Sequence, residues 1–309
     1  MAGIFAKELR IHPDAELVGV ASPTEDRAER FAKQHRIPIA SKSYEFLATH
    51  ESIDIIYVAT TNDRHYDNAL LGLEHDKPVL VEKPITLTTE TLDQLTAKAR
   101  EKKRFLMEAM WMRCFPFYRM LEKRLAPIGP VRSIHAAFHI DIPFNPSHRI
   151  YNPKLGGGAL LDIGIYPIHL LHRTWGLKNA SVDAEMRFAD TGTDISGRFR
   201  FSYPDGREAT LTYGASGYRP HVATFKGELG SITVQDFFHP SKIITKIEGS
   251  PTAVAPLDYP VMGYQYEIDE VVACLRQGSL QSTCVSWTMS REITEWMLTM
   301  SDSQKQTAQ

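Results

Sequence analysis

The stretch IDIIYVATTNDRHYDNALLGLEHDKPVLVEKP, residues 53–84, decides the fold of this chain. It begins with a β-branched run at 53–60, continues through a helical pattern at 65–75, and ends with a second apolar run at 78–82. Continuous apolar runs of this length are typical of buried strands, and a helix between two such strands connects them in parallel. The stretch therefore predicts a strand–helix–strand unit within a parallel, doubly wound sheet.

The same alternation fills the first 110 residues. Further strands are expected at 16–21, 37–40 and 105–109, and further helices at 25–35, 44–50 and 88–103. The chain opens inside a helix, at 1–10, so the first strand and the glycine-rich turn of a dinucleotide-binding fold are absent. That strand is normally central, and its absence exposes two strand edges and removes the N–H groups that bind pyrophosphate. We expect a truncated chain; the alternative is a protein that has lost nucleotide binding.

After residue 111 the pattern changes. One strand is expected at 131–141, a helix follows the glycines at 156–158, and then six strands succeed one another between 182 and 248 without helices between them. Consecutive strands of this kind favour an open, mostly antiparallel sheet. We therefore predict two domains: residues 1–110, α/β and Rossmann-like with the first strand absent, and residues 111–309, α+β.

Composition narrows the class of protein. The 309 residues carry a net charge of −2, which favours neither nucleic acid nor an anionic membrane as partner. No apolar run reaches membrane-spanning length, and no secretion signal is recognised at the start. The three cysteines match neither a zinc spacing nor a disulfide framework, so we expect thiols in a reducing cytoplasm and no metal.

The glycine run 156–158 opens the helix with the strongest chemical signal. Most of residues 159–175 are apolar, and the exceptions share one narrow face at positions i, i+4, i+7 and i+11: Asp162, Tyr166, His169 and Arg173. Such a stripe either lines a pocket or crosses a hydrated interface; the alternative is a solvated stripe on a surface helix. Gly164 and Pro167 lower the helix propensity and predict a kink or irregular turn.

Two strand ends offer further candidates, because ligands bind at the carboxyl ends of parallel strands. Lys83 follows the strand at 78–82, and Pro84 favours an extended Lys83 that points out of the sheet. Thr60, Thr61 and Asn62 end the earlier strand, with His65 close behind, in a turn suited to a ribose or nicotinamide. The alternatives are a solvated lysine and simple helix capping by Asn62 or Asp63.

The end of the strand at 16–21 bears on the choice of nucleotide. Ser22 stands where an acidic residue would bind the 2′-hydroxyl of NAD. Its presence favours NADP, with Arg27 as a candidate partner for the 2′-phosphate; the alternative is that Arg27 faces water.

Four motifs together point to one family: Val58-Ala-Thr-Thr-Asn62 with His65, Val81-Glu-Lys-Pro84, Glu108-Ala-Met-Trp111 with Arg113 and Pro116, and Gly156-Gly-Gly-Ala-Leu-Leu-Asp-Ile-Gly-Ile-Tyr166. The chain resembles the Gfo/Idh/MocA family of NAD(P)-dependent oxidoreductases along nearly its whole length, and the last two motifs are the specific ones. A tyrosine four residues beyond the aspartate, where inositol dehydrogenases have histidine, resembles the branch of dimeric dihydrodiol dehydrogenase, D-xylose dehydrogenase and glucose-fructose oxidoreductase.

The resemblance implies a catalytic pair, Lys83 and Tyr166, with Asp162 beside them. Tyr166 would be the general acid or base on the substrate oxygen, and the charge of Lys83 would stabilise its tyrosinate form. His169 and Arg173 would line the substrate side. The implied cofactor is NADP, with NAD possible, and its expected contacts are Ser22, Arg27, Thr60, Thr61, Asn62, His65, Glu82, Lys83, Trp111 and Arg113.

The resemblance also implies partners. The expected substrate is a polyol, a sugar or a trans-dihydrodiol, and the expected assembly is a homodimer or higher oligomer that pairs through the C-terminal sheet. Two departures from the family pattern bear on the cofactor: the missing first strand with its glycine loop, and Pro23 after Ser22, where NADP-using relatives often have arginine. The competing hypotheses are a non-catalytic dinucleotide-binding regulator and an inactive truncated fragment.

Overall fold

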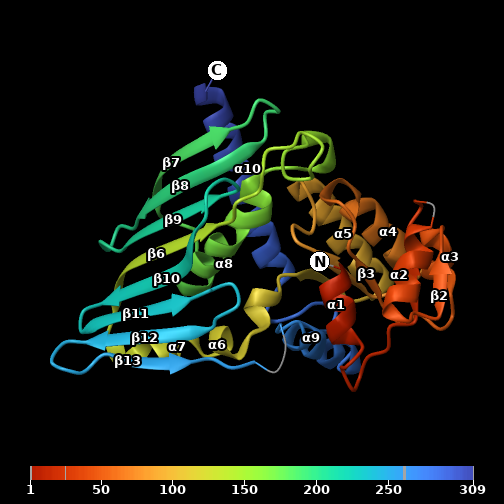
Figure 1. Ribbon diagram of the computed structural model, residues 1–309, viewed down its shortest axis with the longest axis horizontal. Coiled ribbons are helices and arrows are strands. Elements are labelled where there is room, and N and C mark those ends of the chain that lie inside the picture. Colours follow the sequence, from red (N-terminus) through yellow and green to blue (C-terminus); the bar gives the residue numbers. More distant parts are fainter. Residues whose placement is uncertain (1, 25, 260–261, 309) are drawn as a thin grey trace. The chain divides into compact units, whose positions relative to one another are not determined.

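The computed structural model describes residues 2–24, 26–259 and 262–308 (Figure 1). The chain divides into two compact units: Met1–Cys114 with Pro260–Arg291, and Phe115–Tyr259 with Glu292–Gln309. The predicted domains, 1–110 and 111–309, stay a prediction. The first unit thus includes a late segment of the chain, which carries a helix over Gln265–Arg276 and the beginning of the final helix.

The first unit alternates helices and strands as the sequence predicts. Its strands are β1 (Gly19–Ala21), β2 (Ile39–Ser41), β3 (Ile56–Val58), β4 (Val79–Glu82) and β5 (Leu106–Ala109), and its helices are α1 (Ala2–Leu9), α2 (Arg27–His35), α3 (Tyr44–Thr49), η1 (Asn62–Arg64), α4 (His65–Glu74), α5 (Thr89–Lys102), η2 (Trp111–Cys114) and α9 (Gln265–Arg276). Every pairing among these described strands is parallel, so the expected parallel sheet is confirmed.

The parallel sheet is in two pieces in the described part of the chain. One piece has the order β1-β2 and the other the order β3-β4-β5. Among the described strands, β1 pairs with β2 alone and β3 with β4 alone, so each forms the end of its piece. The break lies where a central strand joins the two halves of a dinucleotide-binding sheet, as the Rossmann-like sheet with its first strand absent predicts.

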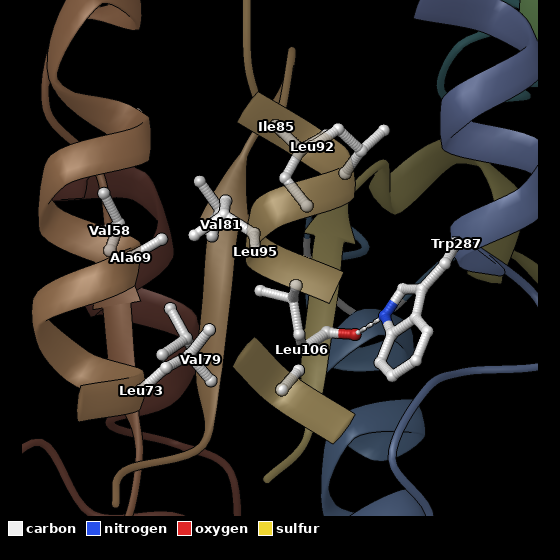
Figure 2. Close-up of a cluster of buried hydrophobic side chains, with 11 residues drawn as sticks. Val58, Ala69, Leu73, Val79, Val81, Ile85, Leu92, Leu95, Leu106 and Trp287 are labelled. Atoms are coloured by element: carbon white, nitrogen blue, oxygen red, sulfur yellow. Dashed lines mark hydrogen bonds between the residues drawn. The ribbon is translucent and has the colours of Figure 1, made fainter. Parts of the chain in front are cut away.

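A dry apolar core fixes the three-stranded piece (Figure 2). It joins side chains from β3, β4, β5, α4 and α5: Val58, Ala69, Leu73, Val79, Val81, Ile85, Leu92, Leu95, Ala99 and Leu106, with Trp287 at one side. The indole Nε1 of Trp287 donates to the carbonyl of Leu106 at 2.8 Å. β4 is buried along its whole length and is therefore closely packed. Lys83 directly follows its carboxyl end, so a rigid strand sets the position of the lysine.

The second unit is built on one sheet of eight strands, in the order β13-β12-β11-β10-β6-β9-β8-β7. Their bounds are β6 (Val131–His139), β7 (Ser181–Phe188), β8 (Asp194–Ser202), β9 (Glu208–Gly214), β10 (Arg219–Gly227), β11 (Gly230–Gln235), β12 (Lys242–Ile247) and β13 (Ala253–Pro256). The pairing of β6 with β9 is parallel and the other pairings of these strands are antiparallel, which confirms a mostly antiparallel sheet.

Helices cover the middle of this sheet. The helix α8 (Ile165–Thr174) packs on β6 and β9, and Figure 1 shows it beside these strands. Trp296, on the final helix α10 (Trp287–Ala308), contacts Phe199 and Phe201 of β8 with its ring. The unit also holds two short helices, α6 (Pro116–Arg119) and α7 (Leu121–Leu125). The helix α8 therefore packs on the central strands of the sheet, which fix the positions of its side chains.

None of the helices in the described ranges is both long enough and apolar enough to cross a bilayer.

Candidate active site

The segment that leads to Tyr166 is not one regular helix. A short 3₁₀ turn, η4 (Pro153–Leu155), precedes the glycine run, and a π-helical turn, η5 (Leu160–Gly164), leads directly into α8. The irregularity predicted from Gly164 and Pro167 is thus present. A Cβ on Gly164 would lie 3.0 Å from the ring of Tyr213, so the glycine lets this turn lie close against β9. π-helical turns occur frequently at functional sites because they re-aim neighbouring side chains.

The middle glycine of the run lies against the backbone of the preceding loop. A Cβ at Gly157 would meet the carbonyl oxygens of Asn152, Ile150 and Arg149 at 2.7–2.8 Å, and backbone cannot move aside as a side chain can. The N–H of Gly157 donates to Asn152 at 3.1 Å, and that of Gly158 donates to Ile150 at 2.8 Å. The glycine run therefore seats the loop 149–152 directly beside the turn η5.

Arg149, on that loop, binds Asp162. Its Nη1 and Nη2 donate to the two carboxylate oxygens of Asp162, each at 2.8 Å. Such a two-point pair fixes orientation as well as charge. Asp162 is close to fully buried, whereas the side chain of Arg149 is 45% exposed. Sequence reasoning missed Arg149, because nothing in its local sequence distinguishes it from a loop arginine.

Tyr166 lies among aromatic rings. Its ring meets Phe138 of β6 edge to face, with centroids 5.1 Å apart, and Phe238 in the same way at 5.9 Å. These two phenylalanines stack on each other at 4.6 Å, and His221 contacts both edge to face. The rings form a largely apolar wall around the phenol, and this wall suits a ring-shaped ligand with an apolar face.

The polar stripe on this segment is buried at three of its four positions. Asp162, Tyr166 and His169 are all buried, so the alternative of a solvated surface stripe is wrong. Arg173 instead forms an ion pair with Glu122 of α7, with Nη1 and Oε1 3.2 Å apart. The substrate contacts assigned to His169 and Arg173 stay predictions.

In the first unit, Lys83 ends β4 in a buried setting. Lys83 is 7% exposed, so the solvated alternative is wrong here too. The carboxylate of Glu82 accepts from the hydroxyl of Tyr57 and, at 3.3 Å, from the backbone N–H of Lys83. Burial raises the pKa of Glu82, while the Tyr57 hydrogen bond and the positive charge of Lys83 oppose that rise. A peptide bond in the cis form joins Lys83 to Pro84.

The turn after Lys83 is held by Glu108 of β5. Its Oε1 accepts from the N–H of Ile85 at 3.1 Å, and its Oε2 accepts from the hydroxyl of Ser290 at 2.6 Å. Burial raises the pKa of Glu108, and the charge of Lys83 lowers it. Lys83 therefore lies close enough to Glu82 and Glu108 for its charge to lower the pKa of each carboxyl group.

A third buried carboxyl group, Glu267 of α9, joins this neighbourhood and was missed by sequence reasoning. Burial raises its pKa well above the ordinary value, and the charges of Glu82 and Glu108 act in the same direction. This environment therefore favours the protonated form of Glu267. Its local sequence resembles that of any surface helix, so only its packing distinguishes it.

His65 links the two strand ends. Its Nδ1 lies 2.7 Å from the carbonyl of Pro84, and its Nε2 lies 3.3 Å from that of Thr60. Burial lowers the pKa of His65, so the ring is neutral. The side chain of Asn68 also donates to the hydroxyl of Thr60, at 3.3 Å. The structure thus brings together the turns after β3 and β4, and His65 braces them.

The other candidates for cofactor contact are placed as follows. Thr61 is the N-cap residue of η1 and Arg64 that of α4, so neither Asn62 nor Asp63 stands at an N-cap position. Ser22 follows β1, and Arg27 begins α2 with an exposed side chain.

Trp111 and Arg113 are both buried on η2. The indole of Trp111 stacks on Tyr264 at 4.6 Å, and Nε of Arg113 donates to the carbonyl of Cys284 at 3.4 Å. The nucleotide contacts assigned to these residues, and to Ser22, Arg27 and the turn at Thr60, stay predictions.

These residues fit one side of a nicotinamide dinucleotide. The turns after β3 and β4 present hydroxyl, amide and ammonium groups at the carboxyl edge of a parallel sheet, which suits ribose and nicotinamide. Within the described ranges, no glycine-rich turn links a parallel strand to a helix, so these ranges hold no cradle for the pyrophosphate. The same ranges contain no group of His, Cys, Asp and Glu side chains that would hold a metal ion.

Comparison with known families defines the class. Residues 2–110 match an oxidoreductase family with an NAD-binding Rossmann fold, and residues 124–233 match the GFO/IDH/MocA C-terminal domain. The chain is therefore a two-part nicotinamide-dependent oxidoreductase. It belongs to the Gfo/Idh/MocA family, as its motifs predict.

The curated relatives are similar over most of their length. Trans-1,2-dihydrobenzene-1,2-diol dehydrogenase of Xenopus tropicalis is 34% identical over 88% of this chain and 85% of the relative. The enzyme of the same name from Mus musculus is 33% identical over 96% and 91%. D-xylose 1-dehydrogenase (NADP(+)) of Hypocrea jecorina is 30% identical over 96% and 88%. All three are dehydrogenases by name, which favours catalysis over the non-catalytic regulator.

Solved structures show the same fold. The 3-ketoreductase KijD10 of Actinomadura kijaniata, in complex with NADP and TDP-benzene, matches with a TM-score of 0.84 and 25% identity over 94% of this chain and 90% of its own. The aldose-aldose oxidoreductase of Caulobacter crescentus matches with a TM-score of 0.86 at 20% identity, which speaks for the fold alone.

Proposed function

We propose that this chain is an NADP-dependent dehydrogenase that acts on a ring-shaped substrate with adjacent hydroxyl groups, either a cyclic sugar or a trans-dihydrodiol. The observation that carries the proposal is the environment of Tyr166. Its ring lies edge to face against Phe138 and Phe238, and it follows Asp162, which is paired with Arg149, by one turn. The dihydrodiol and xylose dehydrogenases among the relatives act on substrates of these two kinds by name.

In the proposed reaction, Tyr166 moves the proton at the substrate oxygen. Oxidation of the alcohol breaks the O–H bond, and the phenolate oxygen of Tyr166 accepts that proton; reduction reverses the step. When bound, NADP⁺ would take up the hydride from the alcohol carbon, and NADPH would supply it in the reverse direction. Lys83 supplies positive charge that favours the phenolate, and Asp162, held by Arg149, orients a neighbouring substrate hydroxyl. Structures of the ketoreductase exist with one tyrosine replaced by phenylalanine and with one lysine replaced by alanine, the residue types assigned here.

The choice of NADP rests on Ser22 and Arg27. No acidic side chain ends β1, where one would bind the 2′-hydroxyl of NAD, and Arg27 is exposed on the first turn of α2. The xylose dehydrogenase and the ketoreductase are both named with NADP. Arg27→Ala should weaken binding of NADPH and leave that of NADH unchanged.

We also infer a cytoplasmic homodimer or higher oligomer that pairs through the eight-stranded sheet. Thr210 on β9, Thr224 on β10 and Thr233 on β11 are only partly buried, and the hydroxyls of Thr224 and Thr233 lie 3.1 Å apart. The three cysteines form no disulfide, which suits a reducing compartment. Sedimentation velocity across a range of protein concentrations tests the assembly.

The deciding experiment compares Tyr166→Phe with the intact chain. Turnover of D-xylose and of trans-dihydrobenzenediol with NADP⁺ should fall on the order of a hundredfold or more, with NADPH affinity retained. Tyr203→Phe is the matched control, because it removes a hydroxyl that binds only the carbonyl of Gly176 in the same unit. Near-normal turnover by Tyr166→Phe would exclude the assigned role. Failure of the intact chain to bind NADPH would favour the inactive fragment.

A further inference from the structure

One buried carboxylate, that of Asp194, hydrogen-bonds to the π-helical turn and has no assigned role in catalysis or binding. Asp194 begins β8 and is 6% exposed. Its Oδ2 accepts from the backbone N–H of Leu160 at 2.7 Å and from the hydroxyl of Tyr213 at 3.0 Å. Leu160 is the first residue of η5, so Asp194 satisfies an amide that has no partner within the turn itself.

The last glycine of the run makes this contact possible. A Cβ on Gly158 would lie 2.6 Å from Oδ1 of Asp194, and Gly158 has a φ of +137°, which side-chain-bearing residues rarely adopt. Gly157 lets the loop of Arg149 lie against the turn η5, whereas Gly158 leaves room for the carboxylate of Asp194. The glycine run thus permits two separate contacts, and both position the turn η5, which carries Asp162.

The charges around Asp194 keep it ionised at neutral pH. Burial raises its pKa to about 6, while the Leu160 amide, the Tyr213 hydroxyl and the positive charge of Lys305 on α10 lower it. Burial and the charge of Asp194 raise the pKa of Tyr213 well above its ordinary value, so Tyr213 remains a hydroxyl donor. A carboxylate at the start of a helical turn is favoured by the aligned amide dipoles, and its hydrogen bonds are stronger for being charged.

We propose that Asp194 is a positioning residue for the proton transfer: it fixes the first residue of η5, and through that turn it sets the positions of Asp162 and of Tyr166. The proposal rests on the function proposed above, in which Tyr166 transfers the proton. Asp194 itself touches neither substrate nor cofactor in this scheme.

The test compares Asp194→Ala, Asp194→Asn and the control Asp190→Asn, which alters an exposed aspartate just before the same strand. Hydrogen–deuterium exchange of a peptide covering 158–166 reports the turn directly and needs no turnover. We expect Asp194→Ala to speed this exchange about tenfold and to lower kcat about ten- to a hundredfold, with KM for NADP⁺ unchanged. Asp194→Asn keeps an acceptor oxygen, so its exchange rate and its kcat should lie between those of Asp194→Ala and those of the intact chain.

The pH profile separates positioning from mere stability. The kcat of the intact chain should fall as the pH drops below about 6, where Asp194 takes up its proton. Asp194→Asn should lack this limb and should have, at neutral pH, the reduced kcat that the intact chain has in acid. If Asp194→Ala does not fold, Gly158→Ala provides the same test, because its methyl group would displace the carboxylate.

Unchanged exchange in 158–166 would overturn the proposal, as would a kcat that falls only in proportion to the folded fraction. Tyr166→Phe distinguishes this failure from that of the proposed function. If that variant turns over normally, the assigned chemistry is wrong. If it is inactive while Asp194→Asn has full kcat and an unchanged pH profile, only the positioning role is wrong.

Discussion

Arg149 and Asp162 form a two-point ion pair across thirteen residues of chain, with both N–O distances at 2.8 Å. The pair depends on the glycine run between them, because Gly157 lets the loop of Arg149 lie against the turn of Asp162. The glycines of the run 156–158 thus act on the candidate site through backbone contact.

Replacing Arg149 should damage activity more than stability. Arg149→Met leaves the nearly buried carboxylate of Asp162 without its two donors, so we expect kcat to fall about 10- to 100-fold. Stability should fall by only about 1–2 kcal/mol, because half of the arginine is in water, which screens the pair. Steady-state kinetics and a urea titration measure the two effects. Arg187→Met, an exposed arginine on β7, is the control; equal losses in both variants would contradict the prediction.

Adding a methyl group to Gly157 should disrupt the site without any change of charge. Gly157→Ala forces three backbone carbonyl oxygens away from a Cβ at 2.7–2.8 Å, so we expect a loss of about 1–3 kcal/mol and a marked loss of turnover. Gly3→Ala is the contrast, because Gly3 lies within α1 and its nearest contact would be 3.6 Å away. That variant should be neutral or slightly stabilising. Thermal melts of both variants decide; a tolerated Gly157→Ala would mean that the loop is mobile.

Asp194 should make stability fall as the pH rises. The pKa of Asp194 is about 6 in the folded chain, against 3.8 for an ordinary aspartate, so the proton is bound more tightly in the folded state. The stabilisation is fully present below pH ~4 and is lost as the pH rises through about 6, by roughly 3 kcal/mol in all. Urea titrations at pH 4.5, 5.5 and 7 measure this slope. Asp194→Asn should flatten it, and an unchanged slope in that variant would assign the effect to other groups, of which Glu267 is the first candidate.

Loss of the His65 brace should weaken nucleotide binding. His65→Ala removes contacts at 2.7 and 3.3 Å to the turns after β4 and β3, so we expect the Kd for NADPH to rise about three- to tenfold. Fluorescence titration with NADPH measures the change. His75→Ala, at the end of the same helix, should bind like the intact chain. An unaltered Kd in His65→Ala would show that these turns do not depend on the histidine.

Much of the fold follows from local sequence. The stretch 53–84 predicts β3, α4 and β4 because two continuous apolar runs flank a helical pattern, and β4 is indeed buried along its whole length. The helix expected at 88–103 is present as α5, and its N-cap residue Thr88 accepts from the N–H of Thr91 at 3.2 Å. The strand β13 was missed, because its four residues are all exposed and show no alternation.

The candidate site was less predictable than the fold. Lys83 and Tyr166 stand in motifs, and their burial agrees with a chemical role. Arg149, Asp194 and Glu267 were missed, since each acts through residues that are distant in the sequence: Asp194 contacts an amide thirty-four residues earlier. Turn and surface patterns around these residues carry no sign of such contacts, which exist only once the sheet has formed.

The gap in the parallel sheet bears on how the protein behaves at high concentration. Among the described residues, β1 and β3 each end a sheet piece, so each has one edge that pairs with no described strand. Each is only three residues long, so a single foreign strand gains few hydrogen bonds there. Self-association through these edges should therefore be weak and non-saturating, rising steadily with concentration, whereas a dimer built on the eight-stranded sheet would saturate. The two kinds of assembly can be told apart by dilution alone.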